Sequence, residues 1–318
     1  MIRKTRNPIK YVTLHLEGLW RTFGTESGMP RSPPAFEGTR AHSISTSGNQ
    51  RMNHMGKVFK RYAPAALSES REALGQVGGS GDLEADIRLC AQQTLEPAFM
   101  KYLPREGKIL EAGSGRGRWV FYLRRRGYDV VGIDLARTEI AAAKAFDPDV
   151  PIEYGNVLQT GYPDRSFEAV ISLGVIEHFE DGPQPALAEV RRILKPGGLF
   201  LVTVPTQNLM RVALFNRIKS TQTFYRRIKG VPLEFEEYRY SRRQFEAELR
   251  EAGFRIVDRA PDDFRPPMNM GLYADSRFLQ HPGRRWELNT AGRVVNASLS
   301  ALSPWLHCSG TLWVCRST

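Results

Sequence analysis

The sequence has few cysteines and no hydrophobic run long enough to cross a bilayer. Its 318 residues include three cysteines, and none of them stands in a C-x-x-C pair or another metal-ligand spacing. This pattern favours reduced, packed thiols in a cytoplasmic protein and predicts no metal site. A spanning helix needs about 20 apolar residues, which no stretch approaches. The three cysteines are Cys90, Cys308 and Cys315.

Positive charge is in excess, with a net charge of +11, but it is unevenly placed. Residues 1–80 hold 12 basic and 5 acidic residues, and residues 206–230 hold six basic residues and no acid. The remainder is close to neutral. A continuous basic face of the kind that binds nucleic acid is therefore not indicated, and we expect no nucleic-acid partner.

The composition divides the chain into two parts. Residues 24–56 are rich in Ser, Pro, Gly, Thr and Asn, which is typical of a disordered tail or linker, and residues 76–81 form a glycine-rich break. We therefore predict a basic, partly disordered N-terminal extension over 1–80 and a single domain over 81–318.

Strand and helix signals alternate along this domain, which indicates an α/β fold with a parallel sheet covered by helices on both faces. Two segments, at about 206–240 and 262–309, interrupt the alternation as insertions, the second with a predicted helix near 284–302. The expected helices are 83–102, 118–126, 138–145, 185–194 and 241–252. The expected strands are 108–112, 129–134, 152–156, 167–173, 199–204, 254–259 and 311–316.

The most informative segment is Glu111-Ala-Gly-Ser-Gly-Arg-Gly117, which lies at the end of an expected strand. The next expected strand contains Val130-Val-Gly-Ile-Asp134 and ends in an acid. A glycine-rich turn before a helix, with an acid at the tip of the next strand, is the layout of a nucleoside site. A dinucleotide fingerprint would place a small residue where Arg118 stands. The Gly-Lys-Ser/Thr of a phosphate loop is missing as well.

Further motifs follow in order, and as a set they resemble the class I S-adenosylmethionine-dependent methyltransferases. The resemblance is to the small-molecule branch (methyltransferase type 11) that includes ubiquinone- and menaquinone-biosynthesis enzymes, and it covers about residues 84–260. It implies a Rossmann-like, mostly parallel sheet of about seven strands whose last strand is antiparallel. The motifs are 111–117, 132–135, 155–157 with 166–170, 175–178, 194–198 and 240–254.

The resemblance implies S-adenosyl-L-methionine as cofactor and assigns its methionine and ribose ends. The turn at Gly113, Ser114 and Gly115 gives backbone access to the methionine moiety, Glu111 lies near its ammonium group, and Asp134 takes the ribose hydroxyls.

The same resemblance assigns the adenine and methyl ends. Leu135 and Val157 flank the adenine, and Asn156 contacts its amino group. The family more often has Asp at this position, but an amide oxygen also accepts that hydrogen bond. Ser172 and Leu173, at the end of an expected strand, lie near the methyl group.

His178 is the candidate general base, since it follows the strand 167–173 and imidazole titrates near neutrality. A structural role, in which Glu177 and His178 cap the next helix, remains open. The chain has Ser172-Leu-Gly-Val175 where methylases of base amines carry Asn/Asp-Pro-Pro-Tyr/Phe. A nucleophilic cysteine and a double-glutamate loop are also missing.

These absences favour a small-molecule, sugar or lipid-linked acceptor, methylated at oxygen, with nitrogen and carbon remaining open. Two alternatives are a methyltransferase-like binding protein without catalysis and an RNA-directed enzyme. The basic, apolar segment 206–230 admits a solvated lid helix, a peripheral contact with anionic membrane, or a nucleic-acid clamp.

Overall fold

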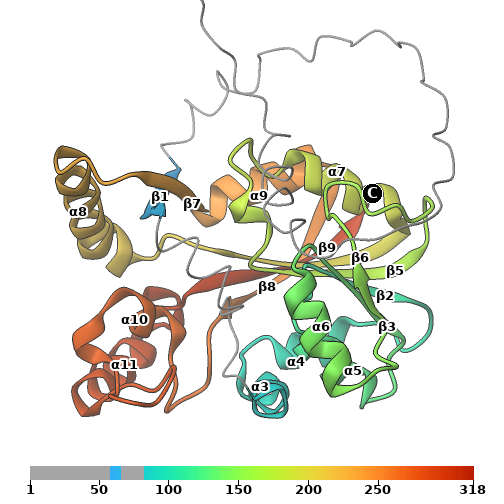
Figure 1. Ribbon diagram of the computed structural model, residues 1–318, viewed down its shortest axis with the longest axis horizontal. Coiled ribbons are helices and arrows are strands. Elements are labelled where there is room, and N and C mark those ends of the chain that lie inside the picture. The colour runs from blue at the N-terminus through green and yellow to red at the C-terminus, as the bar shows by residue number, and fades with distance from the viewer. Residues whose placement is uncertain (1–57, 66–81) are drawn as a thin grey trace, which may run out of the picture. The chain divides into compact units, whose positions relative to one another are not determined.

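A seven-stranded sheet runs through the structure, a computed structural model that describes residues 58–65 and 82–318 (Figure 1). The strand order is β4-β3-β2-β5-β6-β9-β8, and β9 is antiparallel to both of its neighbours while the other pairs are parallel. The predicted fold class is therefore confirmed. The strands are β2 (Ile109–Ala112), β3 (Val130–Asp134), β4 (Ile152–Tyr154), β5 (Phe167–Leu173), β6 (Leu194–Pro205), β8 (Phe254–Asp262) and β9 (Gly310–Ser317).

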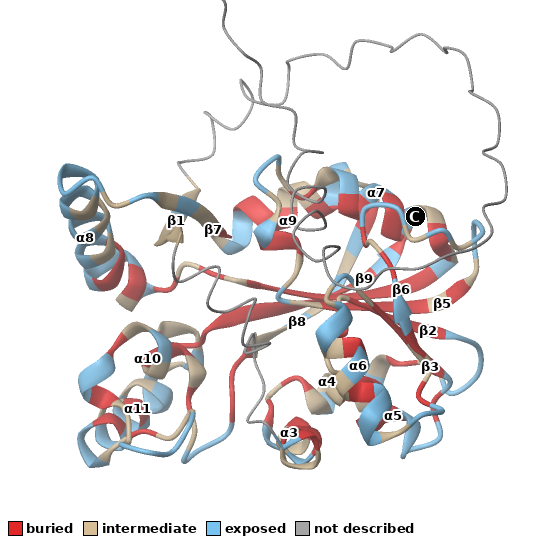
Figure 2. Cartoon of the chain, in the orientation of Figure 1, coloured by how far each residue is buried: buried red, intermediate tan, exposed pale blue. Residues whose placement is uncertain are grey.

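Helices cover both faces of this sheet, and its strands are buried between them (Figure 2). One apolar cluster joins the sheet to α3, α4, α5 and α6, and a second joins it to α7 and α9. β5, with apolar side chains pointing both ways, is the kind of strand that needs cover on two faces. The helices are α3 (Leu83–Leu89), α4 (Glu96–Tyr102), α5 (Arg118–Arg124), α6 (Arg137–Phe146), α7 (Gln184–Ile193) and α9 (Arg242–Glu251).

The single helix predicted over 83–102 is wrong. The structure has α3, the short 3₁₀ helix η3 (Cys90–Gln92) and then α4. Pro97 stands in the first turn of α4, where its missing N–H costs nothing, but it could not continue a helix from before. The Thr94 N–H donates instead to the Asp263 carbonyl at 2.9 Å, which ties the break to the end of β8.

A second, two-stranded sheet was not predicted. β1 (Phe59–Pro64) pairs antiparallel with β7 (Leu233–Arg239), so a strand from the segment assigned to the N-terminal extension joins the insertion at 206–240. The rest of that insertion is a π-helical turn, η5 (Arg211–Phe215), which runs into α8 (Asn216–Ile228). The expected linker 24–56 and the break 76–81 lie outside the described residues.

The insertion at 262–309 forms a small helical unit around Leu272, Leu279 and Leu288. The predicted helix near 284–302 begins at Thr290, because the Asn289 side chain accepts the Gly292 N–H and caps it there. The elements of the unit are α10 (Met270–Asp275), η6 (Arg277–Leu279), α11 (Thr290–Leu302) and η7 (Pro304–Leu306).

The two insertions meet at the buried carboxylate of Asp275. It contacts Arg211 at 2.6 Å, Lys219 at 2.9 Å and Arg239 at 3.2 Å. Burial alone would raise the pKa of Asp275, but the three cations outweigh it and hold this pKa well below its usual range. The cluster ties η5, α8 and β7 to the end of α10.

Candidate active site

The turn after β2 is a run of left-handed glycines. Gly113, Gly115 and Gly117 have φ values of +82°, +53° and +75°, a region in which other residues are strained. The N–H groups of Gly113 and Ser114 both donate to the Ile133 carbonyl at 2.9 Å. The turn is thereby fixed to β3, and α5 begins directly behind it.

The three glycines serve different purposes. A Cβ at Gly113 would lie 2.4 Å from Val175, and one at Gly117 would lie 2.1 Å from Ile152, so both positions allow close packing. A Cβ at Gly115 would meet nothing within 4 Å. Gly115 is therefore the glycine that faces open space, where a ligand can approach the backbone.

Asp134, at the tip of β3, is joined directly to this turn. Its carboxylate accepts the Gly115 N–H at 2.7 Å through one oxygen and the Ala136 N–H at 2.8 Å through the other. Each oxygen retains a further lone pair, which a pair of ribose hydroxyls could use. The Ser114 hydroxyl is buried and has no hydrogen-bond partner among the described residues. These features fit S-adenosylmethionine with its ribose on Asp134.

Glu111 is buried beneath the turn and caps α5 from inside, where its carboxylate accepts the Val120 N–H at 3.1 Å. Burial raises its pKa to about 8, although Arg118 opposes the shift. The ammonium contact that the resemblance implies stays a prediction, and the helix cap is an additional role.

The residues expected at the adenine lie on the turns after β3 and β4. Leu135 is 49% exposed, which is high for a leucine, and Val157 is buried. The Asn156 side-chain oxygen accepts the Leu158 N–H at 2.9 Å, so it already holds its own turn. At the expected methyl end, Ser172 is buried and Leu173 is half-buried.

His178 lies in the 3₁₀ turn η4 (Ile176–His178) and is held by the β1–β7 sheet. Its Nδ1 is 2.6 Å from the Glu236 carbonyl oxygen, so Nδ1 carries a proton and Nε2 keeps the lone pair of the neutral ring. Burial lowers its pKa, but Glu177, the Glu236 carbonyl and Glu237 outweigh this and raise it above 6.5. This orientation leaves Nε2 able to accept a proton, and no hydrogen bond or ion pair joins the His178 side chain to the predicted cofactor residues within the described ranges.

Two buried acids at the same edge of the sheet were missed as site residues. Burial raises the pKa of Glu177 to about 7 and that of Asp262 to about 6. One carboxylate oxygen of each has no hydrogen-bond partner within residues 58–65 and 82–318. Asp262 ends β8, but the expected strand 254–259 stopped before it, so the rule that singled out Asp134, an acid at the carboxyl end of a strand, did not reach it.

The described residues contain no group of three or more His, Cys, Asp and Glu side chains arranged to hold a metal ion. The three cysteines are unpaired, and burial raises the pKa of each thiol to about 12, which excludes them as thiolate nucleophiles near neutral pH.

Replacement of Gly115 by alanine should separate ligand binding from folding. The left-handed φ costs about 1–2 kcal/mol for a residue with a Cβ. The methyl group would stand in the open space beside Asp134, so we expect affinity for S-adenosylmethionine to fall about tenfold or more by calorimetry. Gly127→Ala is the control, since Gly127 also has a positive φ, +83°, and nothing within 4 Å. Equal affinity in the two variants would contradict this placement.

Glu111 should make the unliganded protein less stable as pH rises. Its folded-state pKa of about 8 lies above the ordinary 4.5, so its contribution is complete below about pH 4.5 and is lost through pH 8. Urea unfolding at pH 5.5 and 8.5 should show Glu111→Gln gaining stability relative to the unsubstituted protein at the higher pH. A difference that does not change with pH would refute the buried, protonated state.

Comparison with known proteins agrees with this geometry. The family model described as "Methyltransferase domain" matches residues 110–202. The "Probable S-adenosylmethionine-dependent methyltransferase" of Mycolicibacterium smegmatis is 36% identical over 99 residues, 31% of this chain and 38% of that protein. The demethylmenaquinone methyltransferase of Renibacterium salmoninarum is 32% identical over 133 residues, 37% of this chain and 55% of that protein. The chain thus spans only 38% to 55% of the length of these relatives.

A ubiquinone biosynthesis O-methyltransferase of Cereibacter sphaeroides is 33% identical over 111 residues, 33% of this chain and 44% of that protein. Among solved structures, a chain from the complex of the Haloferax volcanii Trm112 methyltransferase activator with a methyltransferase has a TM-score of 0.51 at 17% identity. It covers 80% of this chain and 97% of its own, and at this identity it supports the fold alone. Residues 110–202, which contain the glycine turn, Asp134 and His178, therefore match a methyltransferase domain and are similar to S-adenosylmethionine-dependent methyltransferases that include enzymes of menaquinone and ubiquinone biosynthesis.

Proposed function

We propose that the protein transfers a methyl group from S-adenosylmethionine to a small-molecule, sugar or lipid-linked acceptor, at an oxygen atom. The observation that carries the proposal is the hydrogen bond between Asp134 and the Gly115 N–H, which sets the carboxylate beside the open face of the glycine turn. The match of residues 110–202 to a methyltransferase domain supports the same conclusion.

The cofactor supplies an activated methyl group on a positively charged sulfur, so the protein has to place the acceptor in line and remove its proton. His178 suits this second task. The Glu236 carbonyl fixes the proton on Nδ1, which leaves Nε2 to accept a proton from a hydroxyl group. Glu177, whose Oε1 lies 4.0 Å from Nε2, stabilises the imidazolium that results.

Calorimetry with S-adenosylmethionine and transfer of its labelled methyl group to a panel of sugars, phenols and lipids test the proposal. We expect binding, and an affinity about 10- to 100-fold lower in Asp134→Ala, since hydrogen bonds to a charged group contribute about 1.5–3 kcal/mol. Asp129→Ala, at the other end of β3, is the matched control. Failure of the unsubstituted protein to bind S-adenosylmethionine would refute the proposed function.

His178→Gln should lower turnover without weakening the binding of the cofactor. We expect kcat to fall about 10²- to 10⁴-fold on a hydroxyl acceptor, the usual range for loss of a general base. Because the pKa of His178 is raised, the unsubstituted enzyme should gain activity as pH rises above 6.5, and the variant should lose this limb. Unchanged turnover with an unchanged pH profile would leave His178 a purely structural role.

We also propose that the segment 206–230 touches anionic membrane, and that the enzyme works on the cytoplasmic side. No helix in the described ranges is long and apolar enough to span a bilayer, so such a contact would be peripheral. The segment combines basic residues with exposed apolar side chains, the composition of an interfacial helix. These are Leu209, Val212, Leu214, Ile218, Phe224, Tyr225 and Ile228, each between 45% and 67% exposed.

Co-sedimentation with phosphatidylserine-containing liposomes tests this contact. We expect binding at low salt that weakens at high salt, since each basic residue near the surface contributes about 1 kcal/mol through a screened interaction. Ile228→Ser, at a position 67% exposed, should reduce binding, whereas Leu302→Ser on α11, 79% exposed, serves as control. An absence of binding at low salt would exclude the membrane contact.

A further inference from the structure

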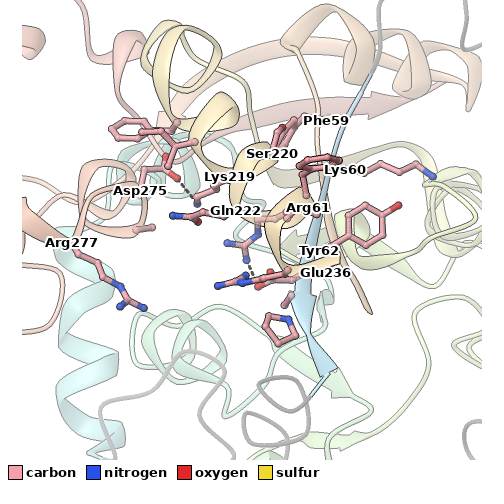
Figure 3. A pocket seen from close by; sticks show the side chains of 18 of the residues that line it. Phe59, Lys60, Arg61, Tyr62, Lys219, Ser220, Gln222, Glu236, Asp275 and Arg277 are labelled. Atoms are coloured by element: carbon pink, nitrogen blue, oxygen red, sulfur yellow. Dashed lines mark hydrogen bonds and ion pairs between the residues drawn. The ribbon is translucent and has the colours of Figure 1, made fainter. Parts of the chain in front are cut away.

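The insertions enclose a cavity of about 800 Å³ that is separate from the predicted cofactor residues (Figure 3). Its walls come from β1, from α8 with the end of η5, from Glu236 of β7, and from the segment 274–278. This volume lies in the range of sites that hold drug-sized molecules. None of the residues assigned to the cofactor lines it, so a different molecule would occupy it.

The charge of the lining is strongly positive. Two acidic residues line the cavity, and both are already neutralised, Glu236 by Arg61 and Asp275 by Lys219. Arg277 lies across the cavity from Arg61, and its side chain has no hydrogen bond or ion pair with another described residue (Figure 3). The cavity therefore has unbalanced positive charge, which favours an anion. The six basic residues of the lining are Lys60, Arg61, Lys219, Arg226, Arg227 and Arg277.

A buried hydroxyl beside Arg277 lacks a partner. Ser276 is 3% exposed and lines the cavity, and its Oγ has no hydrogen-bond partner among the described residues. A buried polar group of this kind is normally satisfied by protein, water or ligand. A hydroxyl donor on the same wall segment as this guanidinium is suited to a phosphate or carboxylate oxygen.

The lining also includes large aromatic and aliphatic side chains, which a free inorganic anion would not need. Phe224 and Phe278 are 65% and 76% exposed, high values for phenylalanine, and they stand on two different elements of the wall. The other large apolar members are Phe59, Tyr62, Phe215 and Ile218.

The cavity shares one residue with the hydrogen bond that orients the candidate base. Glu236 contributes to its wall, and the carbonyl of the same residue accepts the hydrogen bond from His178. We propose that this cavity binds the methyl acceptor, and that the acceptor is an anionic amphiphile. Its phosphate or carboxylate group binds Arg277, Arg226 and Ser276, and its apolar group lies against Phe224 and Phe278. This inference rests on the proposed methyl transfer.

Calorimetry with the full-length protein and dodecyl phosphate, below its micelle concentration, tests the inference. We expect dodecyl phosphate and dodecanoate to bind, and inorganic phosphate and the uncharged dodecyl maltoside to bind at least about tenfold more weakly. Weak binding of inorganic phosphate separates an amphiphile site from a plain phosphate site. Equal binding of the maltoside would overturn the role of charge.

Two variants locate the site. Arg277→Gln and Ser276→Ala should each weaken the binding of dodecyl phosphate about tenfold. Both should leave the melting temperature unchanged, because neither side chain has a hydrogen-bond or ion-pair partner among the described residues. Arg293→Gln, an exposed arginine on α11 outside the cavity, is the control. Unchanged affinity in both variants would overturn the assignment.

The binding of S-adenosylmethionine, measured on the same samples, keeps the two proposals apart. If dodecyl phosphate binds through Arg277 and S-adenosylmethionine does not bind, the cavity assignment stands as an anion site and the methyl-transfer proposal fails. If only S-adenosylmethionine binds, methyl transfer stands and the assignment of the acceptor to this cavity fails.

Discussion

The arrangement of the two insertions depends on one buried group, the carboxylate of Asp275. Arg211, Lys219 and Arg239 belong to three different elements of one insertion, and Asp275 belongs to the other insertion. The two buried arginines and the half-buried Lys219 would repel one another without it, and removal of one member of a buried ion pair usually costs about 3–5 kcal/mol. Burial of these three basic residues therefore depends on the carboxylate of Asp275.

This contact also explains why the charge pattern of 206–230 was ambiguous. The sequence shows six basic residues interspersed with apolar ones, which admits a solvated lid helix, a membrane contact or a nucleic-acid clamp. The structure separates them into two groups, since Arg211 and Lys219 are internal ion-pair partners while Arg217 and Arg227 are exposed. Only contacts with a residue 56 to 64 positions away could make this distinction.

The expected cofactor site was predictable because the residues that indicate it lie close together in the sequence. The spacing of Gly113, Gly115 and Gly117 and the acid at Asp134 each follow from a strand, a turn and the next strand. The different roles of the glycines were not predictable, because their neighbours Val175, in the turn after β5, and Ile152, in β4, are distant in sequence. The break at Pro97 could have been read from proline chemistry, whereas the pairing of β1 with β7 joins residues more than 150 positions apart and leaves no local trace.

The contacts that orient the candidate base come from segments far apart in the sequence, and they show which strand belongs with the methyltransferase domain. His178 takes its orientation from the Glu236 carbonyl, Glu236 belongs to β7, and β7 is paired along its length with β1. Arg61 of β1 also forms the ion pair with the Glu236 side chain. Because the orientation of the candidate base runs through these contacts, residues 58–65 belong functionally with the methyltransferase domain, although 16 undescribed residues separate them from it in sequence. The strand that composition assigns to an extension is thus part of the wall of the cavity that we propose for the acceptor.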